Sequence, residues 1–147
     1  MKFTFKKSER LDSKKVIERL FDKKGSEEIQ SVFHYPFRVS YLNEVKSKGL
    51  KVESENEFDF PSTLNSQPST HFPQILISVS KRSFKRAVDR NLVKRRIREA
   101  YRLNKHLLLQ KQAHQIPAYI AFVYIAKTIE DFVKIEKSMK IIFQKMA

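Results

Sequence analysis

The chain contains no cysteine, and this absence excludes two architectures that are common among small proteins. Without thiols the protein has neither a disulfide framework nor a zinc knuckle. Histidine is also scarce, and its four copies show no metal-ligand spacing: His34, His71, His106 and His114. We therefore expect no metal site and interpret these histidines as surface or half-buried side chains.

Long apolar runs are missing as well. No stretch approaches the roughly 20 apolar residues that a membrane-spanning helix needs. Residues 1–6 (MKFTFK) are too polar for a signal peptide. We expect a cytoplasmic protein that makes no membrane contact.

Acidic residues are in short supply relative to basic ones. Lys and Arg number 30 against 16 Asp and Glu, so the net charge is +14. A charge of this size opposes compaction through self-repulsion and is expected to match a polyanion, either nucleic acid or an acidic membrane. The length of 147 residues fits one domain spanning residues 1–147.

Apolar periodicity predicts the elements of the N-terminal half. A helix is expected over 12–24, with Gly25 as its stop. Period-two alternation over 32–42 predicts one strand with an aromatic face, and Pro36 places it at a sheet edge or a bulge. Segment 43–73 has no periodic apolar face and holds five acidic residues, so we predict a mobile acidic insertion.

The C-terminal half predicts two strands, over 74–80 and 118–126, and a long helix over 83–110 between them. The pair Thr128 and Asp131 forms a capping-box pattern for a last helix. The buried stripe of that helix is expected to hold Ile129, Phe132, Val133, Met139, Ile142, Phe143 and Met146. The order α-β-β-α-β-α predicts an α+β fold, in which helices pack on a small central β-sheet.

Basic residues are concentrated in the long helix and just before it. Residues 81–105 hold eleven basic and two acidic side chains. At about 100° per residue the helix separates into two faces. The apolar arc holds Val93, Ile97, Ala100, Tyr101, Leu107 and Leu108. The basic arc holds Arg90, Lys94, Arg95, Arg98, Arg102 and Lys105.

Three like-charged i,i+4 pairs follow one another along the basic arc, through Arg90, Lys94, Arg98 and Arg102. Each such pair destabilises an isolated helix by about 0.2–0.5 kcal/mol, which a phosphate backbone would offset. A charge run is more often a solvated face. Here the near-absence of acidic neighbours favours RNA contact, because arginine binds phosphate bidentately. Asn91, at the edge of this face, could bond a base edge, a 2′-hydroxyl or a metal-bound water.

Three successive segments carry a family resemblance: SVSKR at 78–82, AVDRN at 87–91 and KRRIREAY at 94–101. Together they resemble the signature of the bacterial ribonuclease P protein component. The core of that signature, the RNR motif, corresponds to Arg90-Asn91-x-x-Lys94-Arg95-x-x-Arg98. The order of elements is also similar from Arg10 to Phe143, so the resemblance covers nearly the whole chain.

The resemblance implies a subunit of a ribonucleoprotein endonuclease. In this family a catalytic RNA, which binds most of the Mg²⁺, hydrolyses the bond that joins the 5′ leader to precursor tRNA. The protein supplies no catalytic side chain. The family fold also has a left-handed β-α-β crossover. The RNA-binding residues that the resemblance implies are Lys81, Arg82, Lys85, Arg86, Arg90, Asn91, Lys94, Arg95, Arg98 and Arg102.

The resemblance also implies a cleft for the leader strand between the first helix and the sheet. Its expected aromatic residues are Phe21, Phe33, Tyr35 and Phe37. Stacking a single-stranded base on an aromatic ring contributes about 1–3 kcal/mol and tolerates any sequence. Aromatic residues on one strand face are nonetheless more often core residues than binding platforms.

Three other functions can be compared with the sequence. A structural RNA binder such as a ribosomal protein has the same composition, and only the signature helix separates the two. A protein-only nuclease needs clustered carboxylates or histidines, but the acidic residues lie mostly in 43–73 or singly on helices. The basic helix could in principle bind DNA, but the sequence lacks the compact three-helix pattern of helix-turn-helix modules.

Overall fold

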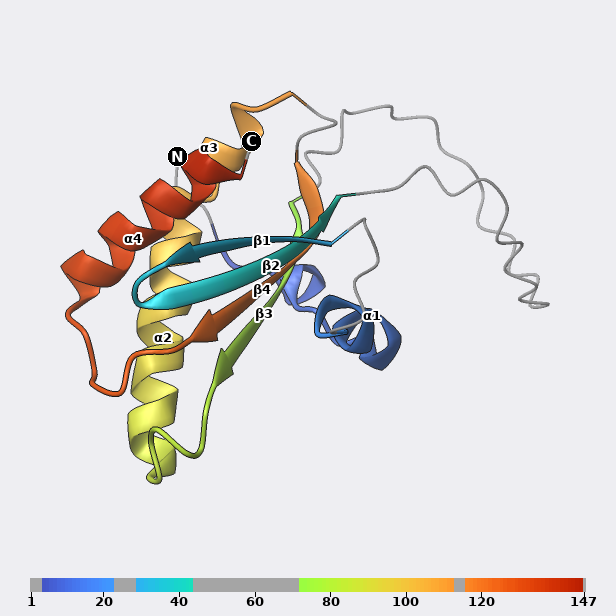
Figure 1. Ribbon diagram of the computed structural model, residues 1–147. Coiled ribbons are helices and arrows are strands. Elements are labelled where there is room, and N and C mark those ends of the chain that lie inside the picture. The colour runs from blue at the N-terminus through green and yellow to red at the C-terminus, as the bar shows by residue number, and fades with distance from the viewer. Residues whose placement is uncertain (1–3, 23–28, 44–71, 113–115, 147) are drawn as a thin grey trace.

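The computed structural model describes residues 4–22, 29–43, 72–112 and 116–146. Its elements follow the predicted α+β class, with one more strand than expected (Figure 1). In chain order they are a 3₁₀ turn η1 (Lys7–Glu9), α1 (Lys14–Leu20), β1 (Ile29–His34), β2 (Phe37–Asn43), β3 (Gln74–Val79), α2 (Ala87–Asn104), α3 (His106–Leu109), β4 (Pro117–Tyr124) and α4 (Phe132–Lys145). Within these residues no helix is long and apolar enough to cross a membrane.

The four strands form one mixed sheet in the order β1-β2-β4-β3. The pairs β1–β2 and β2–β4 are antiparallel, whereas β3 and β4 are parallel. The chain passes from β3 to β4 through α2 and α3, which gives the expected β-α-β unit. The hand of this crossover stays a prediction.

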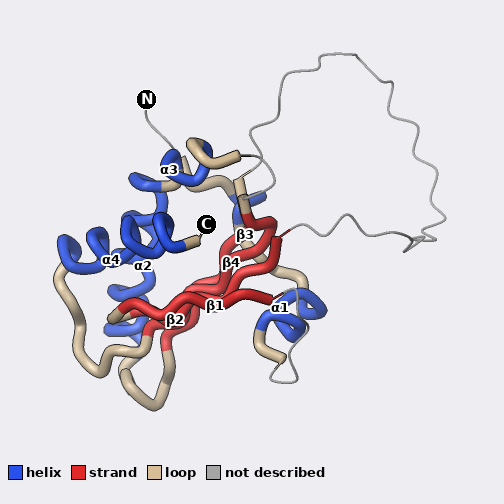
Figure 2. Tube along the Cα trace, turned by 45° about the horizontal axis from the view of Figure 1, so that its top comes forward, coloured by secondary structure: helices blue, strands red, loops and turns tan. Residues whose placement is uncertain are grey.

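The two faces of the sheet are covered unequally (Figure 2). Helices α2 and α4 pack on one face and close the main core there, around Phe122, Tyr101 and Phe143. On the other face, the smaller cluster around Leu42 and Ala121 packs with side chains of α1. Among the described elements, α1 alone covers part of this second face, which is called the open face below.

The single strand predicted over 32–42 is wrong, because the chain turns at Tyr35 and Pro36 to make the β1–β2 hairpin. The alternation of aromatic and polar residues in the sequence continues through the turn. The side of the sheet on which the aromatic residues lie nevertheless changes there. Phe33 lies opposite Arg38 in the hairpin and shares its face, whereas Phe37 and Val39 point into the main core. The aromatic residues therefore do not share one face.

The long helix is shorter than predicted and begins at Ala87, since the 81–86 segment forms turns and extended backbone. The last helix begins at Phe132, and Ile129 and Val133 are exposed, contrary to the predicted buried stripe. Ile135 and Ser138 are buried in their place. The expected capping box does not form, because the helix begins three residues later than an N-cap at Thr128 would place it. Asp131 is itself the N-cap, and its side chain makes no capping hydrogen bond.

The N-terminal segment is tied to the end of α2 by a buried ion pair. Lys105 Nζ lies 2.6 Å from Glu9 Oε1 and donates to the Thr4 carbonyl oxygen at 2.6 Å. Lys105 was expected on the exposed basic arc and is instead buried, where it pairs with Glu9. The helical pattern did not indicate this burial, because Glu9 lies 96 residues earlier in the chain. The predicted acidic insertion falls almost entirely on 44–71, outside the described residues.

Candidate nucleic-acid interface

Helix α2 presents its basic residues outward because its apolar arc is fixed in the core. Val93, Ile97 and Ala100 are fully buried on that arc. On the opposite side Asn91 and Arg95 are exposed, and Lys94 and Arg98 are partly exposed. The predicted separation into an apolar and a basic face is confirmed, apart from Lys105.

The segment that leads into α2 extends the basic surface. Its four predicted RNA-binding residues are all exposed: Lys81, Arg82, Lys85 and Arg86. Phe84 is buried between them and anchors the segment, with its N–H donating to the Ser80 carbonyl at 3.1 Å. Exposed or partly exposed cations therefore recur along the chain from residue 81 to the third turn of α2.

Two of the predicted RNA-binding arginines also bind the protein itself. Arg90 Nη1 donates to the carbonyl oxygens of Phe84 and Lys85, at 2.8 Å each, so Arg90 orders the approach to α2. Arg102 Nε donates to Glu99 Oε2 at 2.9 Å. This bond lowers the pKa of the Glu99 carboxyl and raises the pKa of Arg102. Arg102 therefore carries a partly neutralised charge.

A pocket of about 170 Å³ lies where α2 meets the edge strand β3. Lys94 and Arg98 line it from α2, and Arg10 and Asp12 line it from the segment before α1. That segment pairs with β3, since the Leu11 N–H donates to the Ile75 carbonyl at 2.9 Å. Sequence reasoning missed Arg10, because only the fold brings it to the basic helix.

The open face of the sheet carries an exposed aromatic residue beside a cation. Phe33 on β1 is 64% exposed, and its cross-strand partner Arg38 on β2 is also exposed. Arg38 in turn pairs with Val123 on β4. Phe21, which directly follows α1, is 44% exposed. Arg38 is a second residue that the sequence analysis missed, since the hairpin register alone places it beside Phe33.

The other two predicted cleft aromatics lie elsewhere. Phe37 has no exposed surface and packs edge-on against Phe122 and Tyr124, with ring centroids 6.1 and 5.9 Å away. It is a core residue, and its position does not support a role in the cleft. Tyr35 lies in the hairpin turn, and its hydroxyl donates to Glu130 Oε1 at 2.7 Å. The structure therefore does not bring the four aromatics together.

Metal-ligating side chains do not gather anywhere in the part of the chain that the structure describes. Within it, no group of three or more His, Cys, Asp or Glu residues lies in a position to hold a metal ion.

Comparison with known proteins gives a consistent result. The sequence model of the ribonuclease P family matches residues 5–147. A ribonuclease P protein component from Porphyromonas gingivalis is 47% identical over 78 residues, which cover 52% of this chain and 57% of that protein. One from Haemophilus influenzae is 40% identical over 100 residues, which cover 68% of this chain and 62% of that protein. The chain thus spans about three fifths of the length of these two relatives. By the match across nearly its whole length, the chain belongs to the ribonuclease P family.

Proposed function

We propose that this chain is the protein subunit of a ribonuclease P holoenzyme and binds the catalytic RNA through α2. The observation that carries the proposal is the basic face of α2, with Asn91, Lys94, Arg95 and Arg98 turned away from the core. Exposed arginines with few acidic neighbours suit the phosphate backbone of RNA, because each guanidinium can bind two phosphate oxygens. Membership of the ribonuclease P family supports the catalytic RNA of that enzyme as the partner.

The same proposal assigns the 5′ leader of precursor tRNA to the open face of the sheet. Phe33 offers a base an exposed ring, and Arg38 beside it offers a phosphate a cation. Stacking and charge both act on any sequence, which suits an enzyme that processes many different leaders. Phe21 is a second candidate for stacking, at the end of α1.

In this proposal the hydrolytic chemistry belongs to the RNA. The RNA binds most of the Mg²⁺, and the protein side chains bind and orient RNA without acting as nucleophile or general base. The holoenzyme would act in the cytoplasm, where precursor tRNA is matured.

Replacing Phe33 with alanine should weaken binding of precursor tRNA to the holoenzyme by about 1–3 kcal/mol, because the stacking of one base is removed. The measurement is equilibrium binding of precursor tRNA with a leader and of mature tRNA without one. Only the first should weaken. Val133→Ala, which trims an exposed apolar side chain on α4, is the matched control and should change neither. Equal weakening of both RNAs by Phe33→Ala would contradict the assignment.

Affinity purification of the tagged protein from its own cells tests the proposed function against the structural-RNA alternative. The proposal predicts recovery of one catalytic RNA of a few hundred nucleotides, together with precursor-cleaving activity. Recovery of ribosomal particles without that RNA would favour a ribosomal protein.

A further inference from the structure

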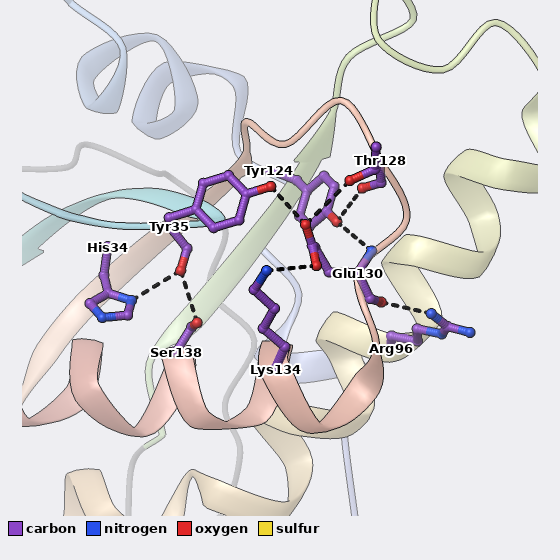
Figure 3. Close-up of polar contacts among 8 residues, drawn as sticks. All are labelled: His34, Tyr35, Arg96, Tyr124, Thr128, Glu130, Lys134 and Ser138. Atoms are coloured by element: carbon purple, nitrogen blue, oxygen red, sulfur yellow. Dashed lines mark hydrogen bonds and ion pairs between the residues drawn. The ribbon is translucent and has the colours of Figure 1, made fainter.

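Glu130 joins four elements of the fold through its main chain and its carboxylate (Figure 3). The Tyr35 hydroxyl donates to Oε1 at 2.7 Å, and Lys134 Nζ lies 3.0 Å from Oε2. The Glu130 N–H donates to the Tyr124 hydroxyl at 3.0 Å. Arg96 Nη1 donates to the Glu130 carbonyl oxygen at 2.7 Å. One residue thus links the β1–β2 turn, β4, α2 and α4.

Arg96 is the contribution of the basic helix to this network. It follows Arg95 directly, but it is half-buried where Arg95 is exposed. Its guanidinium reaches the main chain of the loop before α4 (Figure 3). Arg96 therefore connects α2 to that loop.

Tyr35 is the contribution of the β1–β2 hairpin. Its main chain is held too, since Ser138 Oγ on α4 donates to the Tyr35 carbonyl oxygen at 2.9 Å. Lys134 Nζ lies 5.0 Å from the centre of the Tyr35 ring. The hairpin strands that meet at this turn carry Phe33 and Arg38, so the network fixes the tip of the proposed leader surface.

The charge states of the network agree with its geometry. The hydrogen bond from Tyr35 and the contact with Lys134 lower the pKa of the Glu130 carboxyl. The same bond to Glu130 raises the pKa of Tyr35. Glu130 is therefore ionised and Tyr35 protonated at neutral pH, as this bond requires. Because the bond between Tyr35 and Glu130 is exposed, it adds little to global stability, and removing the Tyr35 hydroxyl should leave the fold intact.

We propose that Glu130 is a positioning residue that holds the hairpin tip in a fixed relation to the basic helix α2. This inference rests on the proposed function, in which α2 binds the catalytic RNA and the face with Phe33 and Arg38 binds the leader. This link keeps the basic face of α2 and the face with Phe33 and Arg38 in a fixed relative orientation. Binding of the catalytic RNA at α2 is thereby coupled to capture of the leader at the hairpin.

Two substitutions cut the link at opposite ends: Tyr35→Phe and Arg96→Gln. The measured quantity is the affinity of the reconstituted holoenzyme for precursor tRNA divided by its affinity for leaderless tRNA. Each variant should lower this ratio by roughly 2- to 30-fold, the range seen for residues that transmit coupling. The rate at saturating precursor should be unchanged. The double variant should reduce the ratio no further than either single variant, because both act through Glu130.

Two control variants separate this effect from loss of charge. Lys140→Gln removes a charge on α4 outside the network and should leave the ratio unchanged. Arg95→Gln removes a charge from α2 and should weaken assembly with the catalytic RNA without changing the ratio. Thermal unfolding of each variant checks that the fold persists.

Two results would overturn the coupling: an unchanged ratio in both single variants, or reductions that add in the double variant. In either case the proposed function would still stand. If the unaltered holoenzyme assembles but binds precursor and leaderless tRNA equally well, the leader assignment itself fails, and the coupling fails with it.

Discussion

Replacing Lys94, Arg95 and Arg98 together with glutamine should remove much of the salt-dependent affinity of the protein for the catalytic RNA. The three side chains lie on the outward arc of α2, opposite buried Val93 and Ile97. Removing one phosphate-binding cation should reduce the slope of log affinity against log salt by about 0.7–0.9, so the triple variant should lower the slope by about 2–3 units. Binding titrations over a series of KCl concentrations measure it.

A matched control replaces Lys137, Lys140 and Lys145 on α4 with glutamine. This triple variant removes the same formal charge from a different helix, so it should keep nearly the full slope. Equal reductions in the two triple variants would mean that net charge alone attracts the RNA, and that α2 has no special part in binding.

Replacing Lys105 with methionine should reduce the free energy of unfolding by about 3–5 kcal/mol, because Glu9 is left buried without its counter-charge. The two side chains are 2% and 5% exposed. The Glu9 carboxylate also accepts from the Lys6 N–H at 2.6 Å, so it cannot easily turn to solvent. Such a reduction is a large share of the roughly 5–15 kcal/mol typical of a small domain. Urea unfolding with linear extrapolation measures it.

The comparison for this prediction is Lys140→Met, which breaks an exposed ion pair to Glu136 and should cost at most about 1 kcal/mol. A second variant, Lys105→Met with Glu9→Leu, removes both charges and should recover part of the stability. If Lys105→Met alone has the same free energy of unfolding as the unaltered protein, the ion pair between Lys105 and Glu9 does not anchor the N-terminal segment.

The two faces of α2 were predictable because the pattern that defines them is local in the sequence. Val93, Ile97 and Ala100 recur at helical spacing, and the cations fall between them, so the sequence alone separates the two faces of α2. The long-range contacts were not predictable in this way. Lys105 has the spacing of a basic-face residue, and only its partner Glu9, at the other end of the chain, explains its burial.

The hairpin shows a second limit of reasoning from pattern. Alternation from Phe33 to Tyr41 looks the same whether the chain runs straight or turns at Tyr35 and Pro36. The turn reverses which side Phe33 faces relative to Phe37, and this sends one ring to the open face and the other to the core. Arg38 lies beside Phe33 for the same reason.

The most direct test of the central claim is cleavage of precursor tRNA at low Mg²⁺ by the cognate catalytic RNA, with and without this protein. We expect efficient cleavage at the 5′ end of the mature tRNA when both components are present, and none by the protein alone. Cleavage by the protein alone, or RNA activity that the protein leaves unchanged, would contradict the central claim.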